Sequence, residues 1–118
     1  MIKGFITFGW IAGFFMTTWV SVSTAESLQE FTLTSMVVQG AKVWSPATLT
    51  IPKGHAVKLK LKNTTDAAHG FSIDELNIKE VIPPGEVKEV TIKVDQAGSM
   101  RFYCHLHPAH VGGELVVE

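Results

Sequence analysis

The chain has 118 residues, of which 46% are hydrophobic and 18% charged, with ten Lys and Arg against eleven Asp and Glu. This near balance argues against a nucleic-acid-binding protein, because such proteins carry a strongly basic surface. The single cysteine excludes an internal disulfide, an iron–sulfur cluster and a two-copper centre with bridging thiolates.

The first 25 residues predict a secretory signal peptide. Met1-Ile2-Lys3 gives a basic start, residues 4–20 form an apolar run, and small residues precede a cleavage site after Ala25. An uncleaved membrane anchor is the alternative, because the apolar run is near the lower length limit for spanning a bilayer. Cleavage leaves residues 26–118 as one domain, periplasmic or secreted and without stable membrane association. No cysteine lies near the cleavage site, so a lipid-modified cysteine is excluded.

The remainder of the chain predicts β-structure, since segments rich in Val, Ile, Thr and aromatic residues alternate with Pro- and Gly-containing turns. In one segment three lysines alternate with apolar residues, which indicates a strand with one solvated face. At most a short turn of helix is expected in residues 74–80. Short strands with frequent turns in fewer than a hundred residues predict a Greek-key β-sandwich. The expected strands are Leu28–Val38, Thr48–Ile51, Ala56–Asn63, Val87–Val94, Ser99–Cys104 and Glu114–Glu118.

The strongest chemical signal lies between the last two expected strands. There Cys104, His107 and His110 follow one another at intervals of three, so a thiolate and two imidazoles in one loop can surround a metal ion. A sulfur ligand with imidazoles suits copper or zinc better than magnesium or calcium. Pro108 stiffens the loop, because it restricts the backbone of the preceding histidine.

A further imidazole, His69, comes from a distant part of the chain. Together with Cys104, His107 and His110 it completes a predicted set of four ligands for one metal ion per chain. A lone cysteine in an exported protein is better explained as a ligand than as a free thiol. Copper is favoured over zinc by its higher affinity for such sites, although one cysteine and three histidines can also form a tetrahedral zinc site.

Each candidate ligand also has an ordinary structural interpretation. Cys104 can be a buried thiol beside a surface histidine, and His69 a surface histidine at a strand end. His110 can be an exposed imidazole at the rim of the site. His105 follows the cysteine directly, and strand alternation directs it away from the sulfur, which favours a surface role or a role behind the ligands. Met100 is expected to pack in the core.

The chain resembles the small periplasmic cupredoxins, which share the fold of plastocyanin and azurin, and among them the nitrosocyanin-like branch. The resemblance covers nearly all of residues 26–118, and it implies a copper protein in which Cys104 and His107 are ligands and His69 occupies the first ligand position. The motifs that carry it are Gly70-Phe71-Ser72-Ile73-Asp74, Glu80-Val81-Ile82 and Cys104-His105-Leu106-His107-Pro108.

The chain departs from these relatives at two places. The nitrosocyanin-like branch has a glutamate where this chain has His69, as blue copper proteins do, and its second loop histidine lies farther from the cysteine than His110 does. Most blue copper proteins end this loop with a methionine ligand, but no methionine follows Met100. His110 therefore stands where a weak axial ligand is expected, and blue, green and red copper sites all stay open.

The resemblance implies an electron carrier that exchanges one electron with a redox partner protein through copper, rather than an enzyme. The alternatives are a copper redox enzyme with an exchangeable ligand position and a protein of copper handling or tolerance. No catalytic carboxylate pair is predicted, because Asp74, Glu75 and Glu80 have the pattern of ordinary surface charges.

Overall fold

The computed structural model describes residues 28–118, so the predicted signal peptide lies outside the described residues. Nine strands and one short 3-10 helix follow one another along this part of the chain. No helix among them is long and apolar enough to cross a membrane. The elements are β2 (Gln29–Val38), β3 (Ala41–Ser45), β4 (Thr48–Ile51), β5 (Val57–Asn63), β6 (His69–Ile73), η2 (Asp74–Leu76), β7 (Ile78–Ile82), β8 (Val87–Ile92), β9 (Gly98–Phe102) and β10 (Gly113–Val117).

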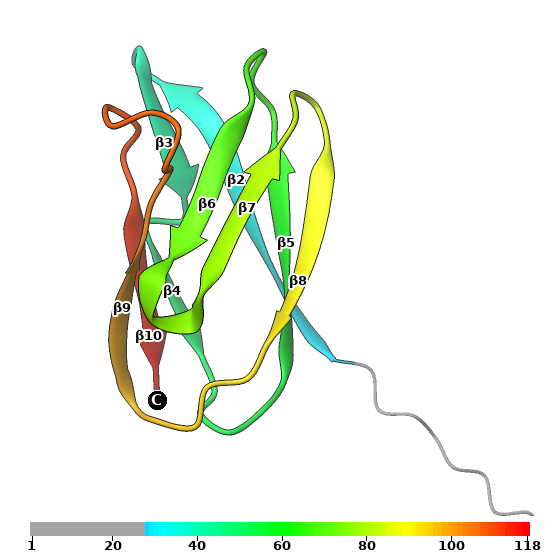
Figure 1. Cartoon of the computed structure of the whole chain (residues 1–118), viewed down its shortest axis with the longest axis vertical. Helices are drawn as coiled ribbons and strands as arrows, with labels where there is room; N and C mark the ends of the chain where they lie inside the picture. Colours follow the sequence, from blue (N-terminus) through cyan, green and yellow to red (C-terminus); the bar gives the residue numbers. More distant parts are fainter. Residues whose placement is uncertain (1–27) are drawn as a thin grey trace, which may run out of the picture.

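The strands form two layers, which confirms the predicted β-sandwich (Figure 1). One layer is a four-stranded sheet in the order β3-β2-β5-β8, and the other combines the sheets β4-β10-β9 and β6-β7. The two small sheets are joined where Ser72 and Tyr103 exchange backbone hydrogen bonds of 2.8 and 3.1 Å. This junction fixes the position of β6 beside the end of β9.

Strand β5 shows how the sequence pattern creates the core. Its apolar residues point inward and are fully buried, whereas its three lysines face outward. The lysines pair with glutamates of the neighbouring strands, as in the Lys58–Glu89 pair at 3.5 Å and the Lys60–Glu30 pair at 3.5 Å. The alternation therefore defines a solvated face, as predicted. The core between the layers consists of Leu33, Trp44, Leu49, Ile51, Val57, Leu59, Leu61, Phe71, Ile73, Ile82, Ile92, Val94, Phe102, Leu115 and Val117.

Three strands, β3, β6 and β7, were not predicted. All five residues of β6 are buried, so its sequence lacks the alternation that identifies a half-buried strand. The expected strand Ser99–Cys104 ends two residues early at Phe102, because the backbone of Tyr103 leaves β10 and pairs with Ser72 of β6. The short helical turn expected in residues 74–80 is the 3-10 helix η2, after which β7 begins.

The loops relevant to the metal-binding motif gather at one end of the sandwich (Figure 1). They are the β2–β3 turn, the segment before β6 and the loop between β9 and β10. At the β2–β3 turn Gln39 and Gly40 both have positive φ, of 50° and 80°, which matches the tight turns that connect twisted strands. Gly113 begins β10 so close to the carbonyl of Ala47 and the ring of Phe102 that a side chain would clash there. The loop is thus held firmly where it re-enters the sheet.

Candidate metal centre

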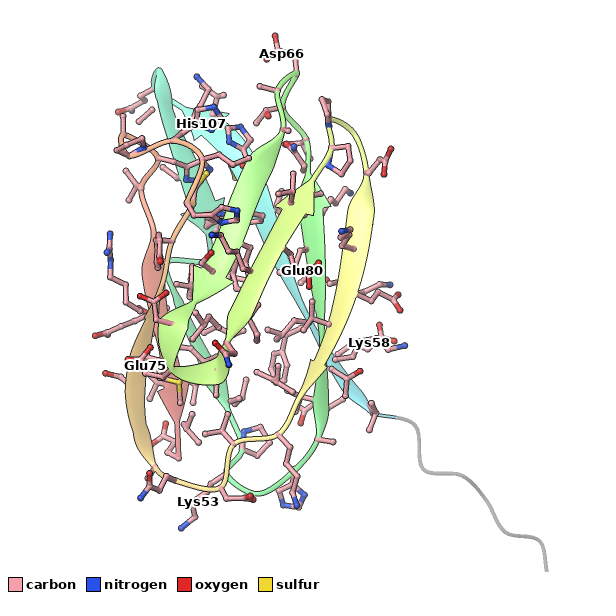
Figure 2. The ribbon with its side chains drawn as sticks, viewed as in Figure 1. Lys53, Lys58, Asp66, Glu75, Glu80 and His107 are labelled. Atoms are coloured by element: carbon pink, nitrogen blue, oxygen red, sulfur yellow. The ribbon has the colours of Figure 1, made fainter. Side chains whose placement is uncertain are left out.

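Three of the four predicted ligands converge at this end of the molecule. The ligand atoms of His69, Cys104 and His107 all lie within 4.8 Å of one another, and the Sγ of Cys104 is 3.7 Å from Nδ1 of His107. His69 is the first residue of β6, whereas the other two belong to the β9–β10 loop. Figure 2 shows His107 at the same end as Asp66 and opposite Lys53. Two distant segments thus bring one thiol and two imidazoles together.

His69 is the most informative member of the cluster. Its side chain is 0% exposed, and neither Nδ1 nor Nε2 has a hydrogen-bond partner among the described residues. Burial, together with the neighbouring His110 and His107, lowers its pKa to about 4. The imidazole is therefore neutral at physiological pH, which is the form that binds metals. A buried polar group without a partner is costly, and a metal ion would satisfy one of the two nitrogens.

Cys104 lies at the boundary between β6 and the β9–β10 loop, and only 4% of it is exposed. The backbone N–H of Gly70, the residue after His69, donates a hydrogen bond of 3.1 Å to its Sγ. A hydrogen bond to sulfur stabilises the anionic thiolate, which is the form that ligates copper. The residue after one ligand thus orients and polarises the next.

His107 is half-buried and is the ligand that lies closest to solvent. It borders a surface pocket of about 510 Å³, whose other lining residues are Gly40, Ala41, Lys42, Ala67, Ala109 and His110. Small side chains dominate this lining, so the edge of the His107 ring stays accessible from outside.

His110 lies beside the cluster but is engaged elsewhere. Its ring is 4.7 Å from that of His69, between centroids, and is 5% exposed. Nδ1 is 3.1 Å from the carbonyl oxygen of Val111, so it must donate, and Nε2 then accepts the hydroxyl proton of Ser35 at 3.0 Å. Both nitrogens are occupied, and a bond to the metal would require His110 to give up one of these partners.

His105 turns away from the sulfur, as strand alternation predicted. Its Nδ1 is 2.7 Å from Oγ of Ser72, and its ring packs against Gly70. Tyr103 points to the same outer side and donates a hydrogen bond of 2.7 Å to Asp74, which raises the pKa of the phenol. The interactions of Ser35 and Gly70 with the cluster were not predicted, because nothing in their local sequence distinguishes them.

The donor set fits a copper ion. Two imidazoles and one thiolate match the His₂Cys arrangement of blue copper sites. A structural zinc site would need a fourth protein ligand, and among residues 28–118 no fourth His, Cys, Asp or Glu belongs to this group. The orphaned nitrogens of His69 are the structural observation that calls for a bound ion.

Comparison with known proteins agrees with this assignment. The chain is 29% identical over 79 residues to cytochrome c oxidase subunit 2 of Thermus thermophilus, and the match covers 64% of this chain. It spans 58% of that relative and 46% of a second subunit 2, from another record of the same species. A solution structure of a copper-binding protein in its apo form superimposes with a TM-score of 0.60 at 20% identity, over 81% of this chain and 93% of that protein. This likeness shows a shared fold.

The match to a protein family is more extensive, since it covers residues 9–117. The predicted cupredoxin resemblance is therefore confirmed, whereas the nitrosocyanin-like branch stays a prediction. With the cluster of His69, Cys104 and His107, this match identifies one copper ion as the cofactor. The chain belongs to the cupredoxin-like domain family.

Proposed function

We propose that this protein is an exported electron carrier that passes one electron at a time between redox partner proteins through a single copper ion. His69, Cys104 and His107 are its ligands in this proposal. The observation that carries it is the convergence of these three donors around a fully buried, hydrogen-bond-free imidazole. Copper, when bound, supplies the Cu(I)/Cu(II) couple.

The way the ligands are held favours electron transfer. His69 is part of a buried strand, and the β9–β10 loop is fixed by Pro108 and by backbone hydrogen bonds such as that from the N–H of His110 to the carbonyl of His107, at 3.0 Å. A site that cannot relax changes little between two oxidation states, so little energy is lost to reorganisation. The half-buried ring of His107 offers the short path from the ion to a partner at the surface.

The comparisons and the leader support the physiological setting. A relative named as a subunit of cytochrome c oxidase belongs to an electron-transfer enzyme. Cupredoxin-like domains typically lie outside the cytoplasm, and residues 1–25 have the composition of a cleaved signal peptide. We therefore place the mature protein, residues 26–118, in the periplasm or outside the cell, where a soluble or membrane-bound redox protein would be its partner.

A second candidate function rests on the pocket beside His107. If His110 keeps its bonds to Ser35 and Val111, the protein supplies three ligands, and a fourth position is free for an exchangeable ligand. The pocket of about 510 Å³ would admit a small molecule to that side of the site. This arrangement would suit small-molecule redox chemistry or copper handling.

The two functions are separated by loading the protein with Cu(II) and adding azide. Both predict one copper per chain and an intense sulfur-to-copper charge-transfer band. The electron-carrier proposal predicts a spectrum that azide barely changes, together with rapid electron exchange with a small redox protein. A clear spectral shift at modest azide concentration would instead favour the exchangeable-ligand function, and absence of the band would contradict both.

A further inference from the structure

We infer that Trp44 is a positioning residue that sets the electronic properties of the copper thiolate through the backbone of Gly70. This inference rests on the proposed function, because it requires Cys104 to be a copper ligand. It concerns a residue that holds no metal and is separated from the cysteine by sixty positions in the chain.

The geometry of β6 explains why Gly70 needs help from side chains. Backbone groups of alternate residues in a strand point to opposite edges. Ser72 uses its N–H and carbonyl to pair with Tyr103, on the edge away from β7. Gly70, two residues earlier, directs its polar groups to the same edge, beyond the end of β9. There its N–H donates to Sγ of Cys104 at 3.1 Å, and its carbonyl accepts from Nε1 of Trp44 at 3.1 Å.

Trp44 is itself firmly held. It is 1% exposed, its backbone N–H donates to the carbonyl of Val111 at 3.1 Å, and its ring contacts that of Phe71 edge to face, with centroids 5.4 Å apart. The indole N–H is therefore a fixed donor. Because it anchors the carbonyl of Gly70, it restricts the backbone torsions that aim the N–H of the same residue at the sulfur.

A glycine is required at position 70, and this makes the anchor important. A Cβ there would lie 2.5 Å from Nδ1 of His105, whose ring is held by Ser72 at 2.7 Å. Without a side chain, Gly70 has wide backbone freedom. The bond from Trp44 and the packing of His105 remove that freedom from two sides, so the N–H···S hydrogen bond keeps one geometry.

The hydrogen bond bears on copper through the sulfur. A donor aimed at the thiolate withdraws electron density from it and favours the reduced, less positive ion, so it raises the reduction potential. Loss of the Trp44 anchor should therefore lower the potential and shift the sulfur-to-copper band, although no ligand has changed.

The test compares Trp44→Phe with Val117→Ala in the copper-loaded protein. Trp44→Phe keeps an aromatic ring in the core but loses the N–H, whereas Val117→Ala opens the core at the opposite end and leaves Trp44 intact. We expect a lower potential and a shifted band in Trp44→Phe alone. Ser72→Ala, which releases His105, should shift both in the same direction by less. A potential and spectrum in Trp44→Phe equal to those of the wild type would overturn the inference.

A measurement without copper keeps the test decisive if Trp44→Phe fails to fold. In the metal-free wild-type protein, the amide proton of Gly70 should exchange slowly and show the shift of a hydrogen-bonded donor by NMR. Rapid exchange, as in an open loop, would overturn the inference. If wild-type protein bound copper without a sulfur-to-copper band, the proposed function would fail instead, while a protected Gly70 amide would still support the contact geometry.

Discussion

The two ends of the sandwich are built from different side chains. At the end opposite the β9–β10 loop, residues such as Ile51 and Val117 form a purely apolar core. The metal end buries Ser35, Asn63, His69 and His110. Asn63 donates to the carbonyls of Ala67 and Ile82, and Ser35 and His110 bond each other, which leaves His69 alone without a partner. The apolar end therefore stabilises the fold, and the polar end is arranged around one unsatisfied group.

The largest expected effect is the loss of the copper chromophore in Cys104→Ser. Oxygen cannot replace the covalent bond of a thiolate, so the intense visible band should disappear entirely. His55→Ala is the matched control, because His55 is an exposed histidine in a turn after β4. It should keep one copper and the full band. A coloured Cys104→Ser variant would show that the metal end is not built around this sulfur.

The next largest effect separates stability from metal binding. Ile51→Ala removes a buried side chain at the apolar end, and it should lower the free energy of unfolding by about 2–5 kcal/mol. Copper content and spectrum per folded molecule should stay those of the wild type. Urea denaturation and optical titration of the same samples test this, and a changed spectrum would mean that the two ends are not independent.

His69→Leu should have the opposite result. It replaces a buried imidazole without hydrogen-bond partners by an apolar side chain of similar size. The free energy of unfolding of the metal-free protein should rise by about 1–3 kcal/mol, the cost of an unsatisfied buried polar group. Copper affinity should fall and the spectrum should change. A metal-free variant less stable than the wild type would show that His69 is satisfied in a way that this account omits.

The pH dependence of the metal-free protein follows from the same residue. In the unfolded chain a histidine binds its proton near pH 6.5, whereas folded His69 does so only near pH 4. Between these values the unfolded state binds more protons, so the free energy of unfolding should fall as pH falls from 6.5 to 4. Burial lowers the pKa of His110 and of His105 as well, with the same sign. Urea denaturation across this range should show a smaller slope in His69→Leu, and an equal slope would contradict the assignment.

Ser35→Ala should have the smallest effect. It removes the hydroxyl that donates to Nε2 of His110, which should cost about 1 kcal/mol of stability. If His110 is no ligand in the wild type, the variant frees a nitrogen beside the ion, and any spectral change should require that nitrogen. The double variant Ser35→Ala, His110→Phe should then recover the wild-type spectrum. A spectrum that changes with His110→Phe alone would place His110 among the ligands.

The sequence predicts the parts of the molecule that follow a local pattern. The alternation in β5 and the spacing from Cys104 to His107 were sufficient to predict a half-buried strand and a metal-binding loop. Strand β6 escaped, because burial on both faces removes the alternation. The partners of His110 could not be predicted either, because Ser35 lies 75 residues away and meets it only in the folded sandwich. The anchor from Trp44 to Gly70 has the same origin, since backbone carbonyls leave no mark on a sequence.

X-ray absorption at the copper edge of the Cu(II)-loaded protein tests the central claim most directly, because it counts the atoms around the ion. The account predicts one sulfur at a short distance and two imidazole nitrogens, with the sulfur absent in Cys104→Ser. A wild-type spectrum without a sulfur ligand, or with imidazoles alone, would contradict a centre made of His69, Cys104 and His107.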